Sequence, residues 1–119
     1  MAKCGVETKS DACRLAQMSF AEFEQSVRTQ KEPPAGLPLA LQALWHDAKG
    51  DWERAHSAVQ QNAQQENPRD GAWVHAYLHR KEGDDGNAGY WYRRAGRPFP
   101  DTSFETEWSE IARELLGKV

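Results

Sequence analysis

The chain has 119 residues, which suits one compact domain, and its 39% hydrophobic and 28% charged content predicts a small core beneath a polar surface. The formal net charge of −3 gives no general attraction to nucleic acid or to an anionic membrane surface. No apolar run approaches the ~20 residues of a membrane helix, and the N-terminal stretch lacks the apolar segment of a secretory signal. We therefore expect a cytoplasmic protein without a membrane or nucleic-acid partner.

The first segment, residues 1–18, is polar and predicts a weakly ordered leader. Its two cysteines, Cys4 and Cys13, are the only ones in the chain. Two cysteines alone do not complete a zinc knuckle, and cytosolic thiols stay reduced, so we interpret them as free thiols. Residues 19–119 are expected to form a single α-helical domain.

The first predicted helix, residues 19–30, begins with a capping box. Ser19 precedes Glu22 by three residues, so that the hydroxyl and the carboxylate satisfy amides at the helix start. Phe20 and Phe23 share one face at helical spacing. The prolines of the following KEPPAGLP segment end this helix.

Two further helices are predicted over residues 39–50 and 52–65. Gly50 ends the first, and Asp51 is placed to cap the second. In each helix, apolar residues recur on one face, as expected for helices that pack together. These stripes comprise Leu41, Leu44, Trp45 and Ala48 in the first helix, and Trp52, Ala55, His56, Val59 and Ala63 in the second.

The remaining pattern predicts three more helices, over residues 72–82, 86–96 and 102–117. We expect Asp70 to cap the first of these and Gly83 to end it. The last helix carries an apolar stripe, and no segment alternates as a strand would. The sequence thus predicts an all-α protein of about six helices.

The chain also repeats itself, because the Gly-Asp dipeptide at residue 50 recurs 33 residues later at residue 83. Such a period is typical of stacked helical hairpins that bury their apolar faces against one another. The chain resembles tetratricopeptide and Sel1-like repeats, which carry a Gly-Asp turn, a small residue early in the second helix and a proline near the unit's end. The matching residues are Gly50, Asp51, Ala55 and Pro68, then Gly83, Asp84, Ala88 and Pro100.

This resemblance implies two tetratricopeptide-like helical hairpins with an N-terminal and a C-terminal capping helix. The chain departs from the repeat pattern where larger apolar residues are usual, since polar residues stand at Gln42, His46, His75 and His79. The same region is also similar to a family of short bacterial proteins with no assigned activity. Both resemblances imply a fold rather than a function.

The histidines are the first candidate functional residues. At ~100° per residue, His75 and His79 lie opposite Tyr77 on their helix. His46 has the equivalent place one repeat earlier, and His56 lies on an inward stripe, so we expect the four imidazoles to gather near one helix–helix seam. Packing with mutual hydrogen bonds is the favoured interpretation. The alternatives are a divalent metal held by His46, His56, His75 and His79, or acid–base chemistry by one of them.

More specific catalytic motifs are missing. A zinc protease needs glutamate directly after the first histidine, and Ala76 stands there. A di-iron carboxylate bundle needs two Glu-x-x-His pairs, and Glu53 with His56 forms the only one. No glycine-rich phosphate loop follows a strand, and no nucleophile signature is present. We therefore favour a noncatalytic protein with no cofactor.

Two surfaces remain to be interpreted. The segment Tyr90–Pro98 combines aromatic residues with arginines, but a packed helix with a basic end explains it better than nucleic-acid binding. In the tetratricopeptide register, a groove is expected to bind an acidic or C-terminal peptide. Its residues are Leu44, Asp47, Trp73, Tyr77, Arg80 and Lys81.

This groove has an alternative interpretation, in which Phe20 and Phe23 of the first helix cover it while the last helix caps the other end of the stack. Opposite charges one repeat apart, at Asp47 with Arg80 and at Lys49 with Glu82, suggest ion pairs between the repeats. The favoured function is a noncatalytic module that binds a protein or peptide, and the alternative is a metal- or small-ligand-binding protein centred on the histidines, with or without enzymatic activity.

Overall fold

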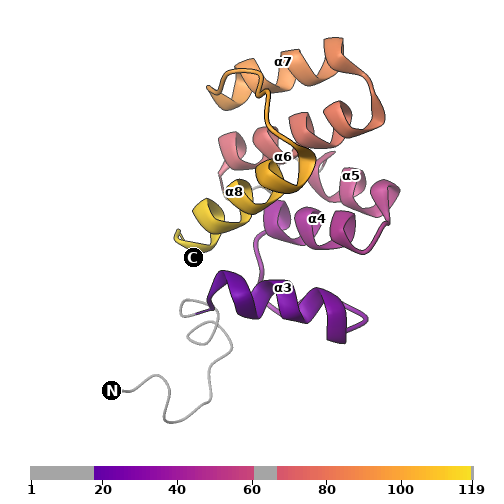
Figure 1. Cartoon of the computed structure of the whole chain (residues 1–119), viewed down its shortest axis with the longest axis vertical. Coiled ribbons are helices and arrows are strands. Elements are labelled where there is room, and N and C mark those ends of the chain that lie inside the picture. Colours follow the sequence, from indigo (N-terminus) through magenta and orange to yellow (C-terminus); the bar gives the residue numbers. More distant parts are fainter. Residues whose placement is uncertain (1–17, 61–66, 119) are drawn as a thin grey trace.

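The protein is all-helical over the residues that the computed structural model describes, 18–60 and 67–118. The expected leader with Cys4 and Cys13 lies outside these residues, except for Met18. No strand occurs in the described part (Figure 1). The helices are α3 (Phe20–Thr29), α4 (Leu39–Ala48), α5 (Trp52–Gln60), α6 (Pro68–Glu82), α7 (Asp85–Ala95) and α8 (Phe104–Leu116).

The helix starts follow local chemistry. Ser19 and Glu22 form the predicted capping box at α3, with both hydrogen bonds present. The Asp51 carboxylate accepts from the amide of Arg54 at the start of α5, as expected. The prediction for α6 is wrong by about one turn: Asn67, not Asp70, is the N-cap, and it accepts from the first amides of the helix. Pro68 favours this earlier start because proline fits the first helical position.

The two Gly-Asp dipeptides form matching corners. Gly50 and Gly83 both have left-handed backbones, with φ of 86° and 91°. At each corner the aspartate amide donates to the carbonyl of the histidine five residues earlier, at 3.0 Å in the first corner and 2.9 Å in the second. Only glycine adopts this conformation at low cost, so each corner reverses the chain and packs α4 on α5 and α6 on α7.

The centre of the molecule is α6. Every residue from Gly71 to His79 is buried, because α4 and α5 pack on one part of the helix, α7 on another and α8 on a third. Figure 1 shows α6 between α7 and the α4–α5 pair. A helix enclosed on all sides must accommodate its polar side chains inside the protein, and these side chains form the sites described below.

The last helix lies elsewhere than expected. Instead of closing the end of the stack opposite α3, α8 lies across α4 and α6 and reaches α3 (Figure 1). Trp108 stacks on Phe23, with ring centroids 5.7 Å apart, and its indole N–H donates to the Leu44 carbonyl at 3.0 Å. The amphipathic helix α8 therefore covers the residues that the sequence analysis expected to line a peptide-binding groove, such as Leu44 and Trp73. Within the described residues, no helix combines the length and apolar character needed to cross a membrane.

Candidate functional site

The predicted groove is largely filled by α8. Four of the six proposed partner-binding residues are at most 5% exposed: Leu44, Asp47, Trp73 and Tyr77. The carbonyl of Leu44 and the indole of Trp73 both hydrogen-bond to α8 side chains. Leu44 and Trp73 are therefore taken up by contacts with α8.

A buried carboxylate that the sequence analysis overlooked organises this interface. Glu107 of α8 accepts from the Arg80 guanidinium at 2.8 Å and from the Tyr92 hydroxyl at 2.6 Å. The Trp73 indole N–H donates to the same carboxylate at 3.3 Å. Arg80 also donates to the Thr102 carbonyl. Burial and the hydrogen bond to the carboxylate both raise the pKa of Tyr92, so its hydroxyl stays protonated as a donor.

The predicted ion pairs between repeats are wrong in detail. Asp47 does not pair with Arg80 but with Lys81, whose ammonium group lies 3.0 Å from one carboxylate oxygen. The Tyr77 hydroxyl donates to the other oxygen at 3.1 Å. Burial raises the pKa of Tyr77, as do the charge of Asp47 and this hydrogen bond. Glu82, expected near Lys49, lies instead against His79 (below). Arg80 is taken up instead by the Glu107 carboxylate of α8.

A pocket of about 360 Å³ remains where α3, α4, α6 and α8 meet. Three proposed partner-binding residues line it: Asp47, Tyr77 and Lys81. Most of its apolar wall comes from α3 and α8, which sequence reasoning had treated only as caps. The additional lining residues are Glu24, Val27, Arg28, Ala48, Phe104, Glu105, Trp108 and Ser109.

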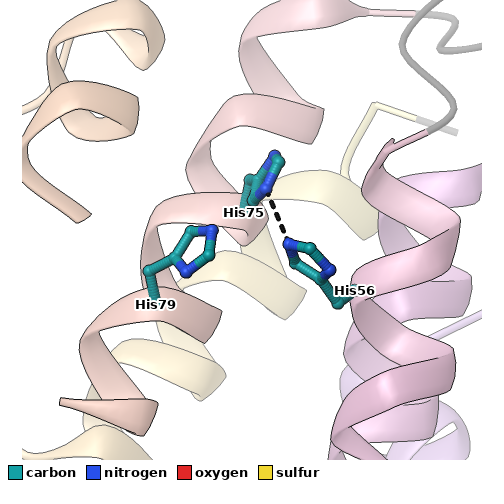
Figure 2. A group of neighbouring side chains, drawn as sticks. All are labelled: His56, His75 and His79. Atoms are coloured by element: carbon teal, nitrogen blue, oxygen red, sulfur yellow. Dashed lines mark hydrogen bonds between the residues drawn. The ribbon is translucent and has the colours of Figure 1, made fainter. Parts of the chain in front are cut away.

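Three of the four histidines meet on the opposite side of α6. His75 and His79 lie one turn apart with stacked rings, and His56 approaches both from α5 (Figure 2). The Nε2 atoms of His56 and His75 are 3.1 Å apart. One ligand nitrogen from each ring lies within 4.8 Å of the others. His75 and His79 are 5% and 6% exposed, so the cluster is mostly sealed.

Two tryptophans and a carboxylate surround this cluster. Trp52 stacks on His56 with ring centroids 4.7 Å apart, and Trp91 stacks on His75 at 4.0 Å. Nδ1 of His79 lies 2.7 Å from a Glu82 carboxylate oxygen. Burial lowers the pKa of His75 to about 3, and the neighbouring imidazoles add to this shift. The pKa of His56 is also lowered, mainly by burial.

His46 lies outside the cluster, contrary to the prediction. Its ring packs edge-on against Trp45 near the α4–α5 corner. Burial, and then the charge of Arg54, lower its pKa. The helical wheel placed His46 on the correct, buried face of α4. His56 of α5, however, contacts His75 and His79 of α6 rather than His46.

The segment with aromatic residues and arginines packs as a helix end. Tyr92 is buried and Trp91 stacks on His75, so neither is free to stack on a base. The Arg97 guanidinium lies 3.4 Å from the centroid of the Trp73 ring and pairs with Glu114. These contacts agree with the packed-helix interpretation of this segment.

Comparisons of the chain with family models, curated proteins and solved structures found no match. The pocket and the histidine cluster are therefore the features of the molecule that bear on its function.

Proposed function

We propose that the chain is a noncatalytic interaction module, built on two tetratricopeptide-like hairpins, that binds a protein or peptide in the cytoplasm. The repeat assignment is supported by the matching corners at Gly50 and Gly83, where equivalent residues make equivalent hydrogen bonds. The cytoplasmic location is supported by the sequence alone.

The observation that carries the proposal is the pocket between α3, α4, α6 and α8. Its volume of about 360 Å³ falls within the range of sites that enclose a ligand group. Phe104 and Trp108 give it an aromatic wall, and Val27 adds aliphatic surface. Such a pocket suits one apolar side chain projecting from a partner segment, the usual form of an energetic anchor in an interface.

The charges at the pocket refine the expected partner. Lys81 is paired with Asp47, and Arg80 is bound to Glu107, so the cationic clamp expected for an acidic peptide is engaged within the chain. Glu24, Arg28 and Glu105 also line the pocket, so its acidic side chains outnumber its basic ones. We therefore propose a partner segment with an aromatic or aliphatic anchor, rather than one selected mainly by its negative charge.

Selection from a random displayed peptide library tests this proposal. Ser109→Trp places an indole in the pocket and is expected to weaken the selected peptides more than about tenfold. The matched control is Glu110→Trp, which adds the same ring at the exposed neighbouring position on α8 and should leave binding unchanged. Failure to select any peptide, or equal binding by Ser109→Trp and the wild type, would refute the pocket as the binding site.

A further inference from the structure

The histidine cluster is held together from two helices by ordinary helix geometry. Residues four apart lie on one face, so α6 presents His75 and His79 side by side. Their ring centroids are 4.9 Å apart, and the His56 ring lies 4.8 Å and 5.0 Å from them. Figure 2 shows the three rings meeting in the space between α5 and α6. Three imidazoles from two helices thus converge at one place.

The nitrogen positions approach those of a metal site. Three imidazoles around a tetrahedral ion, each at 2.0–2.1 Å, have nitrogens roughly 3.3 Å apart. The pair from His56 and His75 is already at 3.1 Å. The complete set lies within 4.8 Å, so closure needs a contraction of roughly 1.5 Å at most, within reach of side-chain rotation.

The protonation of the rings suits a cation. Two Nε2 atoms 3.1 Å apart cannot both carry hydrogen, so at least one presents a lone pair. Nδ1 of His79 faces the Glu82 carboxylate, which favours a proton there and leaves Nε2 as the ligand atom.

One observation separates this cluster from a satisfied packing arrangement. Nδ1 of His75 is buried and has no hydrogen-bond partner within the described residues. An unpaired buried polar atom costs free energy, and natural cores avoid it unless a function retains it. Trp52 and Trp91 wall the cluster on two sides and shield it from solvent. A metal bound at Nε2 would not pair this nitrogen, so the orphan shows only that packing leaves the cluster incompletely satisfied. The convergence of three imidazoles, two of them buried, is the observation that favours a ligand set.

We propose that His56, His75 and His79 bind one divalent first-row transition metal ion, with Glu82 as the positioning residue that orients His79. Neutral imidazole ligands select zinc and its neighbours over magnesium or calcium, which prefer oxygen. Three protein ligands leave a fourth position for water or another small ligand. Glu82 and Asp84 form a second group with His79 that meets the same distance criterion, but both carboxylates are exposed and the buried imidazole set is favoured.

Calorimetric titration of the untagged full chain with zinc chloride tests the proposal. We expect one zinc ion per chain, no comparable binding of magnesium, and the same zinc affinity in a Cys4→Ser, Cys13→Ser background. Titration with cobalt should produce the visible absorption of a low-symmetry site and quench the fluorescence of Trp52 and Trp91, which contact the proposed ligands. Absence of zinc binding, equal binding of magnesium, or loss of zinc with the two cysteines would overturn the proposal.

Variants assign the ligands. His56→Ala and His75→Ala should abolish saturable binding, with folding checked by circular dichroism. Glu82→Gln changes a side chain that is 37% exposed and keeps its shape, so the protein should fold normally while zinc affinity falls about 10- to 100-fold. The controls are His46→Ala, outside the cluster, and Asp84→Asn, which keeps the cap on α7; both should bind as the wild type does. Undiminished binding in Glu82→Gln and His56→Ala, or loss of binding in Asp84→Asn alone, would place the metal elsewhere and refute the assignment.

Discussion

Replacing Glu107 with leucine should severely destabilise the protein, because it removes a buried charge on which three donors depend. Its side chain is 2% exposed and its ionic partner Arg80 is 13% exposed. Breaking a buried ion pair by removing one partner typically costs about 3–5 kcal/mol. Tyr92 and Trp73 also lose their acceptor, at about 1–3 kcal/mol each if fully unsatisfied. The three donors share one carboxylate, so these costs overlap, and we expect about 4–6 kcal/mol in total.

Urea denaturation followed by circular dichroism measures this loss. Glu107→Gln keeps one acceptor oxygen and the side-chain volume, so it should cost less, about 2–3 kcal/mol. Glu110→Leu, on the exposed face of the same helix, is the matched control and should lie within about 0.5 kcal/mol of the wild type. Adding Arg80→Met to Glu107→Leu should restore part of the loss, because a buried pair replaced by apolar groups leaves no unpaired charge. A cost below about 1 kcal/mol for Glu107→Leu would refute the view that this carboxylate organises the interface.

Two further predictions concern stability. The pKa of His75 is about 3 in the folded protein and 6.5 in the unfolded chain, so between pH 7.5 and pH 4.5 only the unfolded chain takes up a proton at this residue. With a chelator present, His75 alone should therefore lower the free energy of unfolding by about 2–3 kcal/mol over this pH range. Urea titrations at both pH values check this, and His75→Gln should show a smaller fall; an unchanged fall would contradict the assignment. An added methyl group meets no neighbouring atom at Gly83 or at Gly86, so backbone conformation decides the effect of alanine at each. Gly83→Ala should lower the free energy of unfolding by about 1–2 kcal/mol because φ is +91° there, whereas Gly86→Ala inside α7 should raise it by about 0.5–1 kcal/mol. Equal effects in thermal unfolding would argue against this backbone explanation.

The features predicted correctly depend on local sequence. Ser19 and Glu22 lie three residues apart, and that spacing alone specifies the capping box. Gly50 and Gly83 mark the corners because few other residues adopt a left-handed backbone at low cost. The convergence of His75 and His79 follows from helical periodicity. Such information is contained within a few residues of chain.

Apart from the start of α6, where Asn67 rather than Asp70 caps the helix, the errors concern packing between distant segments. The amphipathic stripe of α8 predicts that one face is buried, but it does not specify which helices cover that face. For His46, the sequence likewise predicted the face of α4 on which it lies, but it did not predict that His46 would lie outside the cluster formed by His56, His75 and His79. The pairing of Asp47 with Lys81 depends on α8 as well, since Arg80 is taken up by Glu107. A hydrophobic pattern identifies a buried face but does not specify its partner.

Glu107 itself carried a signal that was available in the sequence. It lies three residues after Phe104 and four before Ile111, within the inward stripe of α8. A carboxylate inside an apolar stripe must find donors when it is buried. The identity of those donors, from α6 and α7, required the three-dimensional structure.

The two polar clusters on opposite sides of α6 differ in how completely their hydrogen bonds are satisfied. On one side, both oxygens of Glu107 accept hydrogen bonds, from Arg80 to one and from Tyr92 and Trp73 to the other. Oγ1 of the neighbouring Thr102 has no partner within the described residues, but the carboxylate itself is satisfied. A network of this kind rigidifies a core and is explained by stability. On the other side, Nδ1 of His75 is buried without a hydrogen-bond partner among residues 18–60 and 67–118. Stability alone would favour an apolar residue at that position, since a half-satisfied network is worse than an apolar core. The satisfied carboxylate explains a structural role at Glu107, whereas the convergence of three imidazoles is the reason to seek a bound ligand at the histidines.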